Sequence, residues 1–103
     1  MITEIAYTTY DNEIGLILKE DSTAIDASQI TRIILNVAGS DYDSNVNSEY
    51  FSWPTSETGE IKLLLGDASI PAEIYKTHLI TYDATNTDGI VWGSFWLDAQ
   101  TLP

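Results

Sequence analysis

Residues 74–98 read IYKTHLITYDATNTDGIVWGSFWLD, two long runs of β-branched and aromatic side chains around a polar centre. Side chains of this kind favour extended strands. The Asp-Gly pair that closes the polar centre supplies a residue that accepts a positive φ in a turn. We therefore predict strands at 74–82 and 90–98, joined into a long hairpin by a loop at 83–89.

The preceding part of the chain has the same alternation in shorter runs, which predict strands at 5–9, 14–19, 30–37, 48–53 and 60–65. Polar stretches rich in Asp, Asn and Ser separate these runs, and such residues favour turns. Only the segment around 24–30 has room for a turn of helix, so no helix is available to connect parallel strands. The pattern predicts one all-β domain over residues 1–103, an immunoglobulin-like antiparallel β-sandwich of about seven strands.

The core of this sandwich is predicted from the apolar face of each strand. Side chains two residues apart share a face of a strand, so alternating apolar positions identify the buried face. The predicted core residues are Leu16, Leu18, Ile33, Leu35, Val37, Phe51, Ile61, Leu63, Leu65, Leu79, Val91, Phe95 and Leu97.

A short motif before the hairpin supports the sandwich prediction. Residues 70–75 read IPAEIY. In immunoglobulin-like domains a Tyr near the start of a strand hydrogen-bonds to the backbone a few residues upstream, forming a tyrosine corner. Tyr75 is the candidate for this role, and the alternative is an ordinary Tyr of the core or of an interface.

The order of these features resembles the small immunoglobulin-like domains of tailed phages and prophages, such as the N-terminal domain of baseplate upper proteins. The residues that carry the resemblance are 25–37, the I-P-A-x-x-Y corner at 70–75, and the final hairpin with its polar, Gly-containing turn. The resemblance implies a virion or assembly component that works through protein–protein contacts. It implies no catalytic residues.

The charge balance limits the classes of partner. The 103 residues include sixteen acidic and four basic side chains, for a net charge of −12, with no Cys. Nucleic acids and anionic lipids are bound through Lys and Arg, so we expect neither nucleic-acid nor membrane binding. No apolar run approaches the roughly 20 residues of a membrane-spanning helix, and the N-terminus lacks the basic region of a secretory signal. We expect a cytoplasmic or virion location.

The residues needed for catalysis are sparse. His78 is the single histidine, and it falls in the middle of a predicted strand rather than beside a nucleophile motif. The closest carboxylate pairs, Asp41/Asp43 and Glu57/Glu60, lie in polar surroundings, whereas acid catalysis by a carboxyl group needs an environment that raises its pKa. We therefore predict that the protein is not an enzyme and has no cofactor.

Two acidic loops, 41–45 and 83–89, carry oxygen side chains at alternating positions, as calcium loops do. The EF-hand pattern also requires Gly at position 6 and Glu at position 12. In the first loop these positions hold Val46 and Ser52, and in the second Ala84 takes the place of an expected ligand. We predict no metal site.

The hairpin predicts a candidate interface. If residues 82 and 90 pair, Ile80 faces Trp92 and Lys76 faces Trp96, while Tyr75 lies on the opposite, core side. The other side is then too apolar for a solvated face, and such patches mark partner contacts. The predicted interface residues are Ile80, Tyr82, Ile90, Trp92 and Trp96. Two alternatives remain: the Trp side is the core, or residues 2–10 fold over the patch.

These observations predict a noncatalytic structural or protein-interaction module, a phage or prophage virion or assembly component that contacts a protein partner or itself. The alternative is a small ligand- or carbohydrate-binding β-sandwich that uses exposed Trp and Tyr as stacking surfaces. The two differ in whether Trp92 and Trp96 line a concave pocket or a flat contact.

Overall fold

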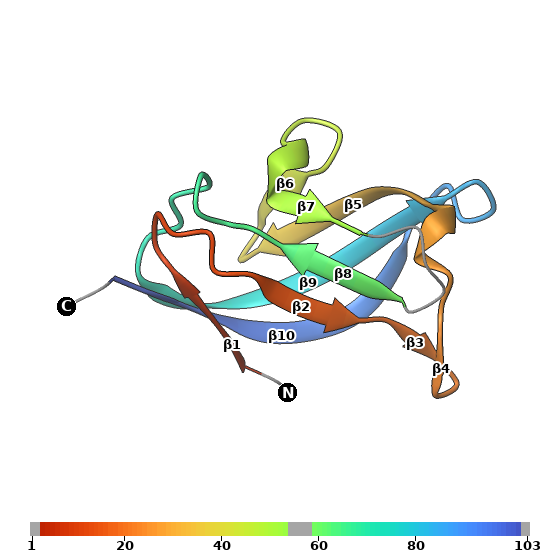
Figure 1. Ribbon diagram of the computed structural model, residues 1–103, viewed down its shortest axis with the longest axis horizontal. Coiled ribbons are helices and arrows are strands. Elements are labelled where there is room, and N and C mark those ends of the chain that lie inside the picture. Colours follow the sequence, from red (N-terminus) through yellow and green to blue (C-terminus); the bar gives the residue numbers. More distant parts are fainter. Residues whose placement is uncertain (1–2, 54–58, 102–103) are drawn as a thin grey trace.

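The computed structural model describes residues 3–53 and 59–101. In these ranges the chain forms ten β-strands and two short 3₁₀ turns, arranged as two facing sheets with a small separate hairpin (Figure 1). This confirms the predicted all-β sandwich. Neither 3₁₀ turn of the described ranges is long and apolar enough to cross a membrane.

The larger sheet has five strands in the order β1-β10-β9-β5-β6. Their bounds are β1 Thr3–Tyr7, β5 Ile30–Val37, β6 Ser40–Asp43, β9 Glu73–Asp83 and β10 Ile90–Gln100. The predicted hairpin, β9 and β10, lies at the centre of this sheet (Figure 1). One pair departs from the predicted antiparallel arrangement, because β1 runs parallel to β10. Side-chain alternation is the same in parallel and antiparallel strands, so the sequence pattern does not distinguish them.

The smaller sheet has the order β2-β8-β7, with β2 Ile14–Ile17, β8 Glu60–Leu63 and β7 Phe51–Ser52. Beyond β2 the chain forms a short hairpin from β3, Lys19–Glu20, and β4, Thr23–Ala24. The expected turn of helix is present as the 3₁₀ turn η1, Ala27–Gln29. The strand predicted at 48–53 is correct for Phe51–Ser52, which form β7. It is wrong for Ser48–Tyr50, which form the second 3₁₀ turn, η2.

The core lies between the two sheets. Ile33 and Leu35 of β5, Ile61 and Leu63 of β8, and Leu97 of β10 are each fully buried. Most of the predicted core residues lie in this cluster, although Leu16 is half-buried at its edge. The alternation of apolar residues did not identify several other buried residues: Ala6, Ile14, Ile30, Tyr50, Ile70, Thr77 and Thr81.

Val91 is the one predicted core residue that the structure places outside, with 61% of its surface exposed. Its strand partner is Ile80 rather than the expected Thr81. The cause is a β-bulge between Val91 and Ser94 of β10.

The tyrosine corner is confirmed. The hydroxyl of Tyr75 donates a hydrogen bond of 2.7 Å to the carbonyl oxygen of Pro71, four residues upstream. Two contacts tie the chain before the corner to the β1–β2 connection. Thr8 donates through Oγ1 to the carbonyl oxygen of Ile70 at 2.9 Å, and Asp11 accepts from the backbone N–H of Gly66 at 2.9 Å. These two contacts therefore hold the segment that leads into β9 against the segment that follows β1.

The β5–β6 hairpin was missed because Ser40–Asp43 reads as a polar loop. Its turn has two residues, Ala38 and Gly39, between the paired Val37 and Ser40, and their φ angles are 50° and 93°. Two positive φ angles define a type I′ turn, which favours Asn followed by Gly. Gly39 suits its position, whereas Ala38 has a Cβ that disfavours a positive φ.

Replacing Ala38 with Asn should therefore stabilise the protein. We expect Ala38→Asn to raise the free energy of unfolding by about 0.5–1 kcal/mol, because Asn tolerates the left-handed conformation that costs Ala roughly 1–2 kcal/mol. Urea unfolding followed by circular dichroism measures this change. Ala38→Val is the matched control and should destabilise, since a β-branched residue fits a positive φ poorly. A lower stability for Ala38→Asn would contradict the type I′ assignment.

Candidate interaction surface

A β-bulge divides the long β9–β10 hairpin into two registers. Four of the predicted pairs are present between Tyr75 and His78 on β9 and Ser94 and Leu97 on β10. Beyond Ser94 the next pair is Val91 with Ile80, so two residues of β10 lie opposite one residue of β9. An extra residue in one strand moves the side chains beyond it to the opposite face of the sheet from the one that regular alternation predicts.

Trp92 is one of the two residues in this bulge, and Gly93 is the other. Gly93 has a φ of 98°, a conformation that glycine adopts readily and other residues rarely do. The bulge turns Trp92 toward the core, where its indole Nε1 donates a hydrogen bond of 2.7 Å to Oγ1 of the buried Thr81. The expectation that Trp92 and Trp96 share a face is therefore wrong.

The outer face of the five-stranded sheet keeps Trp96 and gains other apolar residues. Trp96 lies between Lys76 of β9 and Thr3 of β1 in register, and it is 38% exposed. The next row along the strands has Ile74 and Ile5 on either side of Asp98, with Ile74 60% and Ile5 47% exposed.

A second apolar group lies on the same face, beyond the polar row of His78 and Ser94. There Val91 pairs with Ile80, and Ile80 pairs with Ile34 of β5. We name the exposed apolar side chains of this face, together with the half-buried Ile80 between them, the outer patch: Ile5, Ile74, Ile80, Val91 and Trp96.

The five residues of the predicted interface are thus divided between two faces. Ile80, Tyr82 and Trp96 occupy the outer face, whereas Trp92 and Ile90 lie on the inner side, Ile90 opposite the buried Thr81. Sequence reasoning missed Val91, Ile74 and Ile5. The signal that could have found Val91 is the glycine at 93, because Gly inside a strand often marks a bulge.

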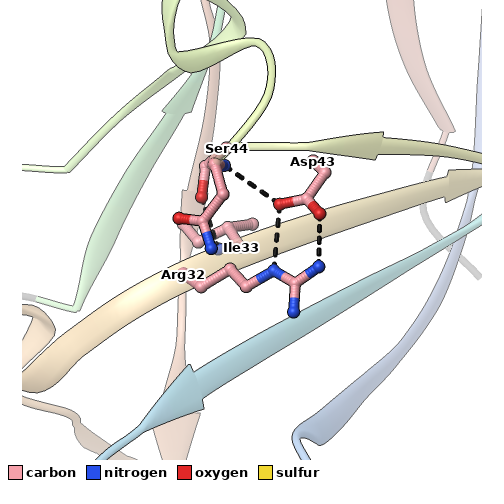
Figure 2. Close-up of polar contacts among 5 residues, drawn as sticks. Arg32, Ile33, Asp43 and Ser44 are labelled. Atoms are coloured by element: carbon pink, nitrogen blue, oxygen red, sulfur yellow. Dashed lines mark hydrogen bonds and ion pairs between the residues drawn. The ribbon is translucent and has the colours of Figure 1, made fainter.

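An ion pair lies at one side of the outer face, next to the edge strand β6 (Figure 2). Arg32 of β5 donates from Nε to Asp43 Oδ1 at 3.0 Å and also donates from its terminal nitrogen to Oδ2. The guanidinium carbon lies 5.1 Å from the ring centre of Tyr82, a cation–π distance. Next to this pair, the backbone N–H of Ile33 donates to Ser44 Oγ at 2.9 Å (Figure 2).

This arrangement uses charge to protect a sheet edge. Asp41 and Asp43 stand on β6, and charged side chains on an edge strand oppose pairing with another chain. The hydrogen bonds from Arg32 hold the pKa of the Asp43 carboxyl below its ordinary value of 3.8. The same contact raises the pKa of the Arg32 guanidinium. The edge strand β6, with its charged side chains, therefore forms one border of the outer face.

The acidic loops use their carboxylates within their own turns. Asp83 Oδ1 accepts from the backbone N–H groups of Thr85 and Asn86 at 2.9 and 2.6 Å, which lowers the pKa of Asp83. Asp41 Oδ1 accepts from Asn36 Nδ2 at 2.6 Å. Among residues 3–53 and 59–101, no three His, Cys, Asp or Glu side chains are grouped so that they could hold a metal ion. Glu57 lies outside the described residues.

His78 lies half-buried on the outer face between Asn36 of β5 and Ser94 of β10. In the described ranges no carboxylate hydrogen-bonds to its ring, so the arrangement of nucleophile, base and orienting acid is not formed there. Its position fits a polar residue in the middle of a sheet face.

A cavity of about 280 Å³ opens at the side of the sandwich, between β2 and the bulge of β10. Trp92 and Phe95 of β10 and Leu16 of β2 supply apolar walls, and Glu4 of β1 also lines the cavity. Trp92 therefore lines a concave site, whereas Trp96 lies on the outer face of the five-stranded sheet, so the two tryptophans belong to different surfaces.

Comparison with protein-family models finds no match for this chain, and no curated protein is similar enough in sequence to be counted as a relative.

The bulge can be tested with two matched glycines. Gly93 and Gly15 both have open space where a Cβ would stand, but only Gly93 has a positive φ. We expect Gly93→Ala to lower the free energy of unfolding by about 1–2 kcal/mol through backbone strain. Gly15→Ala should be neutral or slightly stabilising, because it restricts the unfolded chain. Equal effects of the two substitutions, measured by urea unfolding, would argue against the bulge.

The Arg32–Asp43 pair predicts a specific pH dependence. Because the pKa of Asp43 is lowered in the folded protein, its contribution to stability is present above 3.8 and is lost as pH falls through the lowered value. Asp43→Asn should cost roughly 0.5–1 kcal/mol at pH 7, the range for a partly exposed ion pair. The difference from wild type should shrink as pH falls below 3.8.

Urea unfolding between pH 2.5 and pH 7, roughly the range over which carboxylates titrate, follows this difference. Arg32→Gln is the matched variant, since it removes the other partner, and the double variant should cost less than the two single losses added together. A difference between wild type and Asp43→Asn that stays constant over this range would contradict the assignment.

Proposed function

We propose that the protein is a noncatalytic interaction module that associates with a second copy of itself through the outer patch. The observation that carries the proposal is the group of Ile5, Ile74 and Trp96, which are 47%, 60% and 38% exposed on adjacent strands. Exposed apolar patches of this kind mark contact surfaces, and a central Trp contributes strongly to binding.

The charges around Trp96 favour a second copy as the occupant. Lys76 lies beside Trp96, and Asp98 lies one row further along. In a contact with two-fold symmetry the same patch is used by both molecules, so each Lys76 can meet Asp98 of the second copy. The chain has only four basic residues, and Arg32 and Lys76 both lie on this face. The face is therefore less negative than a net charge of −12 suggests.

The biological role that we propose is a phage or prophage virion or assembly component. The support is the resemblance in layout, together with the Tyr75–Pro71 hydrogen bond that completes the corner. Assemblies of this kind are built from repeated contacts between folded domains, which agrees with a small sandwich whose exposed apolar residues lie on its larger sheet.

A second candidate function is ligand binding, the alternative expected from the aromatic content. The observation that favours it is the side cavity, which Trp92 lines. This cavity lies on the opposite side of β10 from the outer patch, so the two functions do not compete for one surface.

The association is tested by sedimentation and light scattering over a range of concentrations. We expect wild type to associate and the double variant Val91→Ser, Trp96→Ser to remain folded and monomeric. The matched control is Ile17→Ser, Val46→Ser, which changes two residues that are 61% and 76% exposed outside the outer patch. This control should associate as wild type does.

Salt separates self-association from binding to a basic partner. Two copies of a chain with net charge −12 repel each other at long range, and salt screens that repulsion. Association should therefore strengthen as the salt concentration rises, whereas attraction to a basic partner would weaken. A wild type that stays monomeric at high concentration and high salt would refute self-association through this face.

A further inference from the structure

The side cavity has the features of a binding site that is separate from the outer patch. Its volume is about 280 Å³, and its walls include the rings of Trp92 and Phe95 and the side chain of Leu16. Apolar walls with a few polar groups are typical of ligand sites. Trp92 is held in place because its indole N–H is bonded to Thr81, so the wall is formed before any ligand binds.

Glu4 gives the cavity its charge. This residue pairs with Leu97 in register, which directs its side chain to the inner side of β1, and it is half-buried at the cavity. Within residues 3–53 and 59–101 its carboxylate forms no hydrogen bond or ion pair. A carboxylate next to apolar walls is stabilised by an opposite charge, so the complementary ligand is a cation on an apolar stem.

The edge of β2 borders the same cavity. In the described part of the chain, β2 has a neighbouring strand on one side only, which is β8. Gly15, Leu16 and Ile17 of β2 line the cavity. A free strand edge offers its N–H and C=O groups to an extended peptide, which is the basis of strand addition.

We propose that the side cavity binds a lysine or arginine side chain carried by an extended segment of a partner protein, which adds as a strand to the free edge of β2. The apolar stem packs against Trp92 and Leu16, and the cationic group meets the Glu4 carboxylate and the indole face. The net charge of −12 attracts a basic segment. This inference does not rest on the outer patch, because the cavity and the patch lie on opposite sides of β10.

The probe is the peptide acetyl-Val-Thr-Lys-Val-Thr-amide, titrated into isotopically labelled protein and followed by NMR. We expect shifts at the indole N–H of Trp92 and the backbone amide of Gly15. The same peptide with norleucine in place of Lys keeps the apolar stem and lacks the charge, and it should bind about five-fold more weakly. The double variant Val91→Ser, Trp96→Ser, which changes the outer patch and is expected to be monomeric, should bind the Lys peptide as wild type does.

The protein variants test the role of Glu4. Glu4→Gln should weaken binding of the Lys peptide about five-fold and leave the norleucine peptide unchanged. Glu49→Gln is the matched control, because it removes the same charge from an exposed residue of η2 that does not line the cavity, and it should bind as wild type does.

Three results would overturn the proposal. The first is the absence of shifts at Trp92 and Gly15 with millimolar Lys peptide, and the second is equal affinity for the Lys and norleucine peptides. The third uses n-butylamine, which carries the cation without a backbone. Binding of this amine as tightly as the Lys peptide would show that strand addition contributes nothing.

Discussion

Gly93 has a φ of 98°, and this one backbone conformation breaks the register of the long β9–β10 hairpin. The bulge turns Trp92 inward, where it donates to the buried Thr81, and turns Val91 outward. On both sides of the bulge, β10 remains paired with β9. The division between core and surface at the centre of the molecule therefore depends on a residue without a side chain.

The two surfaces of the protein follow from this break. On the outer side, Trp96 stays in the expected register and joins apolar residues of β1 and β9 that are distant in sequence. On the inner side, Trp92 becomes a wall of the cavity beside β2. A regular hairpin would instead have placed both rings on one face and left no indole at the side of the sandwich. The bulge thus separates one expected aromatic patch into two sites of different shape.

Regular alternation could be predicted from the sequence, and local breaks in it could not. The long strands β5, β9 and β10 were found because each contains a long run rich in β-branched and other large apolar residues. The corner was predicted from Tyr75 because its chemistry is local, a hydroxyl that reaches a carbonyl four residues away. The edge strand β6 was missed because its polar residues form a strand only when β5 is beside them.

The candidate site shows the same limit. Trp96 was placed correctly because it lies on the regular side of the bulge, whereas Trp92 was misplaced because one extra residue reverses facing. Ile5 and Ile74 were missed because they join Trp96 only through pairing with β10.

Hydrogen exchange of the two indole N–H groups, followed by NMR in dilute, monomeric protein, tests this account most directly. Trp92 Nε1 is bonded to Thr81, and Trp96 lies on the open face, so we predict slow exchange for Trp92 and fast exchange for Trp96. Equal exchange rates, or a protected Trp96 with an unprotected Trp92, would contradict it.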